Sequence, residues 1–212
     1  MPSDRTRVRR LPERGHYDRA TIDAILDAMP IAHVGYVLDG APIVTPTLQW
    51  REGDHVYWLG SAASRMLRKV DGAEACLTVT ILDGMVLARS AFHHSANYRS
   101  VMLLGTAHAV IDPAEKAARL ERFVNAVYPG RWDILRPMTE QELKGTSVLG
   151  MPIDEASAKI RQGPPIDDDE DVSLDIWAGV IPINYNVGAP IPEKHVREGS
   201  LPPSHVTNFR IG

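Results

Sequence analysis

Two serines and two cations follow a short apolar segment and form the first group of residues that could do chemistry. Segment 56–59 is followed by Ser61, Ser64, Arg65 and Lys69. This pattern predicts a strand that turns into a short helix, capped by Ser61, whose N-terminus carries partial positive charge. Arg65 in the first turn opposes the helix dipole, and a bound phosphate would offset that repulsion. The group therefore predicts a phosphate site, with ordinary surface cations as the alternative.

A second polar run follows the next pair of expected strands. It contains Asn97, Tyr98, Arg99 and Ser100, which offer amide, phenol, guanidinium and hydroxyl groups to a ligand. Arg65 and Arg99 come from different elements, so the sequence alone does not show whether they converge in space. Arg99 has a structural alternative, as the partner of a nearby carboxylate.

Three histidines, His93, His94 and His108, raise the question of a metal site. Adjacent residues on a strand point to opposite faces, so the first two cannot easily hold one ion. No acid or cysteine stands nearby at ligand spacing, so we expect hydrogen-bonded histidines and no metal. No serine-histidine-aspartate set, nucleophile elbow or glycine-rich dinucleotide fingerprint occurs either. If the protein is an enzyme, a bound cofactor carries the chemistry.

The elements that would position these residues are mostly strands. Helices are expected after the caps at Asp18 and at Asp112-Pro113. Asp39-Gly40 and Asp83-Gly84 have the composition of hairpin turns. Pro46 cannot donate to a ladder, so its strand should bend or lie at an edge. By alternation and turn signals, the expected strands span residues 31–38, 43–50, 56–59, 75–82, 85–91, 101–111, 147–153, 156–161 and 177–183.

Length and composition predict one domain, with residues 1–16 as an arginine-rich arm and residues 188–212 as an irregular tail. The 212 residues are 44% hydrophobic and 24% charged, as in an ordinary globular protein. A net charge of −4 argues against general nucleic-acid binding. We expect the arm to be solvated, with a contact to nucleic acid or to an acidic partner as the alternative. No secretory signal and no apolar run near the ~20 residues that cross a bilayer occur, so a cytoplasmic protein without membrane contact is expected.

Three segments together resemble a known family, the FMN-binding split β-barrel proteins related to pyridoxamine 5'-phosphate oxidase, near the nitroimidazole-resistance branch. The segments are residues 60–65, 78–84 and 93–101. The resemblance covers roughly residues 15–190 and implies a mostly β, six-stranded split barrel of Greek-key type with flanking helices. It also implies a homodimer with two FMN sites at the subunit interface. Many relatives have a histidine where this chain has Leu59, so no role of that histidine carries over.

The resemblance also implies how the site residues divide their roles. Ser61, Ser64 and Arg65 would hold the FMN phosphate, and the hydroxyls of Thr45 and Thr47 would flank the flavin ring. The complete set of expected cofactor-binding residues is Thr45, Thr47, Ser61, Ser64, Arg65, Lys69, Asn97, Tyr98, Arg99, Ser100 and Trp177.

The resulting hypothesis is a flavoprotein that acts on a small molecule as an FMN-dependent oxidoreductase, by two-electron transfer, with NADH or NADPH as the donor. A non-enzymatic FMN carrier or ligand-sensing regulator is the main alternative. A third alternative is a structural dimer that has lost the cofactor. Heme binding is known among split-barrel relatives, but no axial-ligand motif stands out in this sequence.

Overall fold

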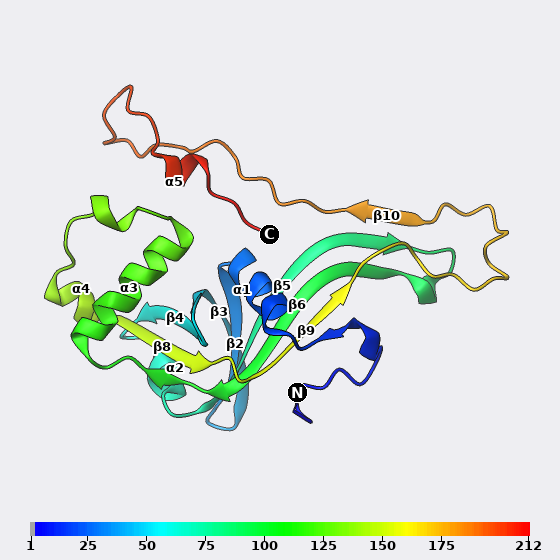
Figure 1. Cartoon of the computed structure of the whole chain (residues 1–212), viewed down its shortest axis with the longest axis horizontal. Helices are drawn as coiled ribbons and strands as arrows, with labels where there is room; N and C mark the ends of the chain where they lie inside the picture. The colour runs from blue at the N-terminus through cyan, green and yellow to red at the C-terminus, as the bar shows by residue number, and fades with distance from the viewer. Residues whose placement is uncertain (1–2) are drawn as a thin grey trace.

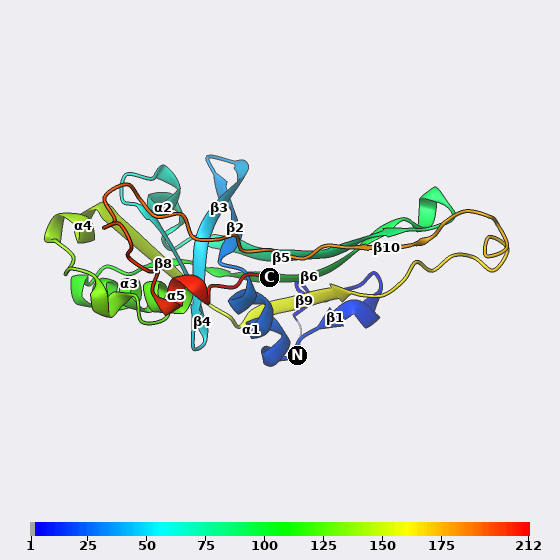
Figure 2. The same ribbon diagram turned by 90° about the horizontal axis from the view of Figure 1, so that it is seen from above.

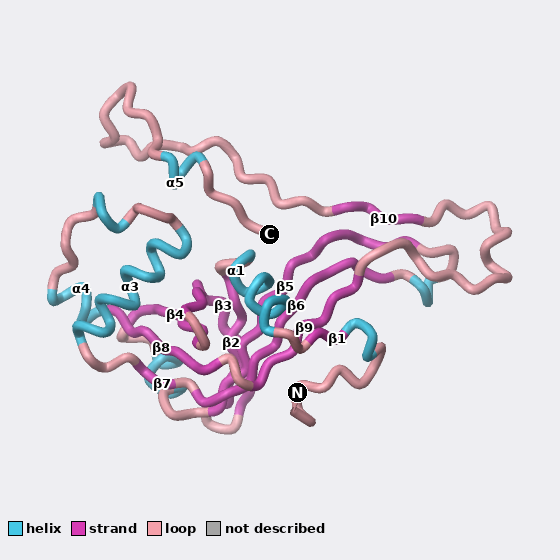
Figure 3. Tube along the Cα trace, in the orientation of Figure 1, coloured by secondary structure: helices cyan, strands magenta, loops and turns pink. Residues whose placement is uncertain are grey.

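The computed structural model describes residues 3–212, apart from the side chain of Met66, and is dominated by one antiparallel sheet (Figures 1 and 3). The strands pair in the order β1-β9-β6-β5-β2-β3-β4-β8-β7, and β10 pairs with β5. The mostly β prediction is confirmed, with ten strands in place of six, partly because short strands add to the sheet. The strands are β1 (Gly15–His16), β2 (Ile31–Leu38), β3 (Ala41–Glu52), β4 (His55–Ser61), β5 (Glu74–Leu87), β6 (Ser95–Thr106), β7 (His108–Ala109), β8 (Thr146–Pro152), β9 (Glu155–Arg161) and β10 (Gly179–Pro182).

Five α-helices accompany the sheet in the described residues, and the caps of α1 and α3 are those expected from the sequence. Asp18 accepts a hydrogen bond from the backbone N–H of Thr21 at 2.9 Å, and Asp112 accepts one from Glu115 at 2.7 Å. Both are N-cap geometries that satisfy free N–H groups of the first turn. The helices are α1 (Arg19–Ala28), α2 (Arg65–Val70), α3 (Pro113–Val127), α4 (Glu140–Gly145) and α5 (Ser204–Thr207).

Strand β3 turns a corner between the two halves of the sheet. Its residues 41–48 pair with β2, whereas residues 49–52 pair with β4. The strand therefore closes the sheet around a core that α1 and α2 cover. Trp58, Leu77, Leu103 and Leu149 are fully buried in that core. A second apolar cluster around Trp50 lies under α3.

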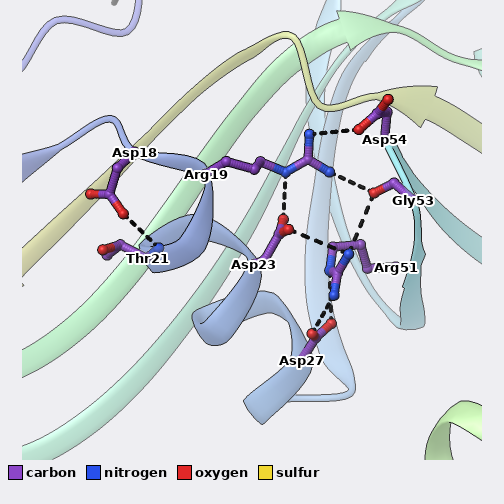
Figure 4. Close-up of polar contacts among 8 residues, drawn as sticks. All are labelled: Asp18, Arg19, Thr21, Asp23, Asp27, Arg51, Gly53 and Asp54. Carbon is purple, nitrogen blue, oxygen red and sulfur yellow. Dashed lines mark hydrogen bonds and ion pairs between the residues drawn. The ribbon is translucent and has the colours of Figure 1, made fainter.

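A network of ion pairs fixes α1 to the turn between β3 and β4 (Figure 4). Arg19 contacts Asp23 at 2.6 Å and Asp54 at 3.1 Å, and it donates to the carbonyl of Gly53. Arg51 forms two hydrogen bonds with the carboxylate of Asp27, at 2.6 and 3.0 Å. These bonds raise the pKa of Arg51, mainly through Asp27. We regard the network as structural, because each cation in it has a carboxylate partner.

The expected hairpin at Asp83-Gly84 is wrong, because β5 runs through it without turning. The pairing register with β6 shifts between Leu82 and Gly84, so Asp83 is an extra residue in the manner of a β-bulge. Alternation changes there: Ile81 is buried before the shift, and Val86 is buried after it. Gly84 is required by packing, because a Cβ atom at that position would lie 2.9 Å from the carbonyl oxygen of Ile181 on β10.

The expected strand over residues 101–111 is also displaced. Strand β6 begins at Ser95 and ends at Thr106, and the chain then leaves the ladder. The cause is Ala107, whose N–H donates to Ala73 at 3.0 Å and whose carbonyl accepts from Gly72 at 2.7 Å. The next residues, His108–Ala109, pair with β8 instead. The polar run of residues 97–100 is therefore strand and not loop.

The long strands carry the molecule outward into an elongated extension (Figure 2). We use this name for the distal parts of β5, β6 and β9, the connections 88–94 and 162–178, and β10. The chain then returns along the sheet as the C-terminal tail (Figure 1), whose last residue donates from Gly212 N–H to the carbonyl of Ala28 at 2.9 Å. The tail is largely irregular, as expected, apart from α5.

The N-terminal arm is anchored to the sheet by several contacts, which the sequence did not predict, while Arg5, Arg7, Arg9 and Arg10 remain exposed. Arg5 forms ion pairs with Glu74 at 2.9 Å and with Glu155 at 3.5 Å. The N–H of Val8 donates to the Tyr17 hydroxyl at 2.8 Å. Strand β1 at the end of the arm pairs with β9. No helix of residues 3–212 is long and apolar enough to cross a membrane.

Candidate functional site

The first group of expected ligand residues lies where β4 gives way to α2. Ser64, and not Ser61, occupies the N-cap, and its side chain makes no capping bond. Ser61 instead closes a turn before the helix: its carbonyl accepts from Ser64 N–H at 2.8 Å, and its hydroxyl accepts from Ala63 N–H at 3.2 Å. The expected cap at Ser61 is wrong, because the helix starts only at Arg65.

Packing of α2 leaves its cations at the surface. Leu67 and Val70 are buried, while Arg65 and Lys69 are exposed. Gly60 permits this arrangement, since a Cβ atom there would lie 2.8 Å from a methyl group of Leu67. In the described part of the chain, no carboxylate lies within ion-pair distance of Arg65 or of Lys69. An anion can therefore approach both of them without displacing a protein partner.

Strand β3 brings two hydroxyls to the same region. The hydroxyl of Thr47 donates to the carbonyl of Leu59 at 3.0 Å, which joins β3 to the chain just before Ser61. Thr45 is two residues away on the same face of the strand. Residues 41–48 pair only with β2 in the described chain, so the other edge of this segment keeps free backbone groups. The prediction that Pro46 lies at an edge is confirmed.

The second group of expected residues is mostly engaged within the protein. Arg99 makes two hydrogen bonds with the Asp83 carboxylate, at 2.7 and 2.9 Å, and these bonds raise its pKa. The structural alternative for Arg99 is thus the observed one. Asn97 is buried, accepts a hydrogen bond from Arg161 and donates to the carbonyl of Gly163 at 3.1 Å. The hydroxyl of Ser100 donates to the carbonyl of Lys159 at 3.3 Å.

The two groups lie in different parts of the chain. In Figure 1, α2 belongs to the compact half, whereas the beginning of β6 lies in the extension. Trp177 precedes β10 in the extension and is 67% exposed. A single chain therefore brings Thr45, Thr47 and the α2 group together but does not bring Tyr98 or Trp177 to them.

Arg161, at the base of the extension, was not singled out by its sequence. It is 5% exposed and donates to the carbonyls of Gly163 and Pro164, at 3.1 and 3.0 Å. Burial lowers its pKa, and the charge of Arg14 adds to this effect. A lone arginine at a strand end carries no signal of this role, because the role depends on the turn that follows it.

The histidines are in part engaged locally. His93 contacts Asp168 at 3.2 Å, and His94 contacts the carbonyl of Ser90 at 2.8 Å. In residues 3–212, no group of three or more histidine, cysteine, aspartate or glutamate residues is placed to hold a metal ion. The ring of His33 makes no hydrogen bond to the described residues and lies on the exposed face of β2.

Comparison with known proteins identifies the family. The family model for pyridoxamine 5'-phosphate oxidase matches residues 18–160. No curated protein matches the chain. Among solved structures, the flavocytochrome Anf3 from Azotobacter vinelandii is 49% identical, with a TM-score of 0.95, over 100% of this chain and 99% of that one.

Two further structures extend this comparison. The FAD and heme binding protein from Mycobacterium smegmatis is 38% identical, with a TM-score of 0.89, over 93% of this chain and 97% of that one. A putative 5-nitroimidazole antibiotic resistance protein from Bacteroides thetaiotaomicron is 21% identical, with a TM-score of 0.56, over 69% and 86% of the two chains, and shares the fold. The chain therefore belongs to the pyridoxamine 5'-phosphate oxidase family and has a split β-barrel fold.

Proposed function

We propose that this protein binds a flavin and a heme and works as an oxidoreductase. The observation that carries the proposal is its 49% identity to a flavocytochrome over the whole of both chains, together with the 38% identity to an FAD and heme binding protein. When bound, the flavin exchanges electrons in pairs with a small donor, and the heme exchanges them singly.

The residues around α2 fit a flavin phosphate. Arg65 and Lys69 are exposed and unpaired within the described residues, and Ser61 and Ser64 add hydroxyl groups. A guanidinium can bind a phosphate through two parallel hydrogen bonds. The free edge of β3 beside Thr45 and Thr47 offers backbone N–H and C=O groups to the polar edge of a flavin ring. The chain itself thus supplies groups that can bind the phosphate of the cofactor and groups that can bind the polar edge of its ring.

The sequence analysis expected FMN, but the comparison favours a different flavin. The relative from Mycobacterium smegmatis is named for FAD, so we propose FAD. Denaturing the purified protein and analysing the released flavin by chromatography against FMN and FAD standards tests this directly. Release of FMN alone would return the assignment to the original expectation.

We propose that the protein is a homodimer in which each flavin contacts both chains. The outer face of β2 and β3 exposes apolar side chains in one patch: Val37 is 70% exposed, Val44 is 66% exposed, and Ile31 and Leu48 lie across from one another. Contiguous apolar surface of this kind is typical of an interface between subunits. A second copy would also let Tyr98 and Trp177 of one chain approach the α2 group of the other, which one chain alone does not allow.

The same patch contains the imidazole that best fits a heme. A heme iron takes a neutral imidazole nitrogen in apolar surroundings. His33 stands on this face, in register with Pro46, and its ring has no hydrogen-bond partner in the described chain. We therefore propose that His33 would hold the heme iron. The His33→Ala protein should lose the heme Soret band and keep flavin absorbance, whereas His108→Ala, an exposed histidine elsewhere, should keep both.

The oxidoreductase activity is tested by reduction of the bound flavin. We expect NADH or NADPH to bleach the flavin band in anaerobic stopped-flow absorbance, and oxygen or a small electrophile to restore it. If dithionite bleaches the band and neither nicotinamide does within minutes, direct reduction by these donors is wrong. The carrier or sensor alternative would then be favoured.

A further inference from the structure

A basic cleft lies between the N-terminal arm and the outer face of the sheet, apart from the α2 group. It has a volume of about 410 Å³. Its floor comes from three neighbouring strands, and the register places Thr80, Ser100 and Lys159 in one row across β5, β6 and β9. Figures 1 and 2 both show the N-terminal segment running beside β9. The floor thus presents the Thr80 hydroxyl and the Lys159 ammonium group on either side of Ser100, whose own hydroxyl donates to the carbonyl of Lys159.

The arm supplies the wall of the cleft, which includes Arg7 and Arg10. Several contacts hold this wall in place. Ser3 donates to Glu155, Thr6 is only 2% exposed, and Arg5 bridges Glu74 and Glu155. On the other side of Arg7, the N–H of Val8 donates to the Tyr17 hydroxyl at 2.8 Å, so the wall is organised before any ligand binds.

The positive charge of the cleft is not balanced by nearby acids. Glu74 and Glu155 are both engaged by Arg5. Within residues 3–212, Arg7, Arg10 and Lys159 have no carboxylate within ion-pair distance. Three cations that converge on one cleft repel one another, and an anion of high charge density removes that repulsion. Guanidinium, ammonium and hydroxyl donors together are the set that binds phosphate oxygens.

We propose that this cleft binds the phosphate groups of a nucleotide. The inference rests on the proposed function, because two sources follow from it: the ADP half of a bound FAD, or the diphosphate of a nicotinamide dinucleotide that acts as donor. A nucleic acid fits less well, because the lining contains no aromatic side chain on which bases could stack.

Calorimetric titration of the purified protein with ADP, pyrophosphate and adenosine tests the site. We expect ADP and pyrophosphate to bind and adenosine to give no heat, since the recognition is of phosphate. The double variant Arg7→Ala/Arg10→Ala should bind ADP about tenfold more weakly or worse, because each lost guanidinium removes charged hydrogen bonds. Arg122→Ala/Arg197→Ala removes the same charge from outside the cleft and should bind as the wild type does.

The state of the flavin separates the two sources. If the cleft holds the ADP half of FAD, ADP should bind FMN-loaded but not FAD-loaded protein, and the double variant should lose affinity for FAD and not for FMN. If the cleft holds a separate dinucleotide, ADP should bind both forms. Should the protein retain no flavin at all, the proposed function fails, and the same titrations of the apo-protein still test the cleft. Absence of ADP binding in every form, or equal ADP affinity in wild type and double variant with unchanged circular dichroism, would overturn the inference.

Discussion

The compact barrel and the extension differ in how they bury apolar side chains. In the barrel, Trp58, Leu77 and Leu103 are completely buried by the chain itself. In the extension, Trp177 is 67% exposed and Phe92 is 86% exposed, although both are aromatic. The barrel thus buries these large side chains within one chain, whereas the extension leaves its two aromatic side chains exposed. The expected flavin residues divide along the same line: Thr45, Thr47 and the α2 group lie beside the barrel, whereas Tyr98 and Trp177 lie in the extension.

The largest expected effect tests the barrel side of this comparison. Trp58→Ala should lower the free energy of unfolding by about 3–5 kcal/mol, because it empties a fully buried site. Trp177→Ala, the matched change in the extension, should alter unfolding of the isolated chain by no more than ~0.5 kcal/mol. Urea denaturation followed by fluorescence measures both. A comparable loss in the two variants would mean that the extension is packed as firmly as the barrel.

The next effect concerns association. Val44→Asp places a charge in the outer patch of β2 and β3, where a partner would have to bury it, so the dimer should dissociate. Light scattering should change from twice the 23.4 kDa chain mass to the mass of one chain. Ile111→Asp, at a position that is 80% exposed outside the patch, should leave the dimer intact. A wild-type protein that is monomeric at micromolar concentration would rule out the interface.

A smaller effect is expected at Arg65, in the proposed phosphate site beside α2. Arg65→Ala should weaken flavin binding by roughly 1.5–3 kcal/mol, the usual contribution of a hydrogen bond to a charged group. Riboflavin lacks the phosphate and should bind wild type and variant alike. Arg122→Ala, an exposed arginine on α3, serves as the control. Fluorescence quenching of the flavin gives the affinities, and equal values in wild type and Arg65→Ala would make Arg65 an ordinary surface residue.

The smallest effect is a pH dependence at α4, whose Leu143 packs against the second apolar cluster of the barrel. Hydrogen bonds from Arg136 and from the backbone N–H of Thr139 lower the pKa of Glu142 from 4.5 to about 2. Because the folded-state pKa is lowered, the contribution to stability is present above pH 4.5 and is lost as the pH falls toward 2. Side-chain NMR titration of Glu142 should show the lowered midpoint. Arg136→Ala should move that midpoint upward, and an unchanged midpoint would exclude the ion pair as the cause.

The sequence correctly predicted those helix caps and turns that depend only on neighbouring residues. The caps at Asp18 and Asp112, and the turn at Asp39-Gly40, were predicted because neighbouring residues satisfy them. The predictions failed where a distant segment decides. Gly84 reads as a turn residue, but its lack of a side chain serves the approach of β10. Nothing near residue 84 in the sequence indicates that contact.

For the candidate site, the sequence indicated which elements carry the expected residues but not how those residues are arranged in space. Arg65 lies in the first turn of a short helix, as expected, because the strand and helix patterns around it are local, although the helix starts later than its expected cap at Ser61. For Arg99 the sequence left a ligand contact and a carboxylate partner open; Asp83 pairs with it, and the bulge that places Asp83 is not visible in the sequence. The anchoring of the arginine-rich arm was missed for the same reason, since its partners Glu74 and Glu155 lie far along the chain.

The central claim is that one flavin site combines Arg65 of one chain with Tyr98 and Trp177 of another. Mixing two defective proteins, Arg65→Ala and Tyr98→Ala, after partial unfolding and refolding tests this claim most directly. In a mixed dimer one site carries both substitutions and the other carries neither, so about a quarter of all sites should regain wild-type affinity. Flavin titration of the mixture should show this high-affinity fraction, which neither protein shows alone. A mixture that titrates as the plain average of its two components would contradict a shared site.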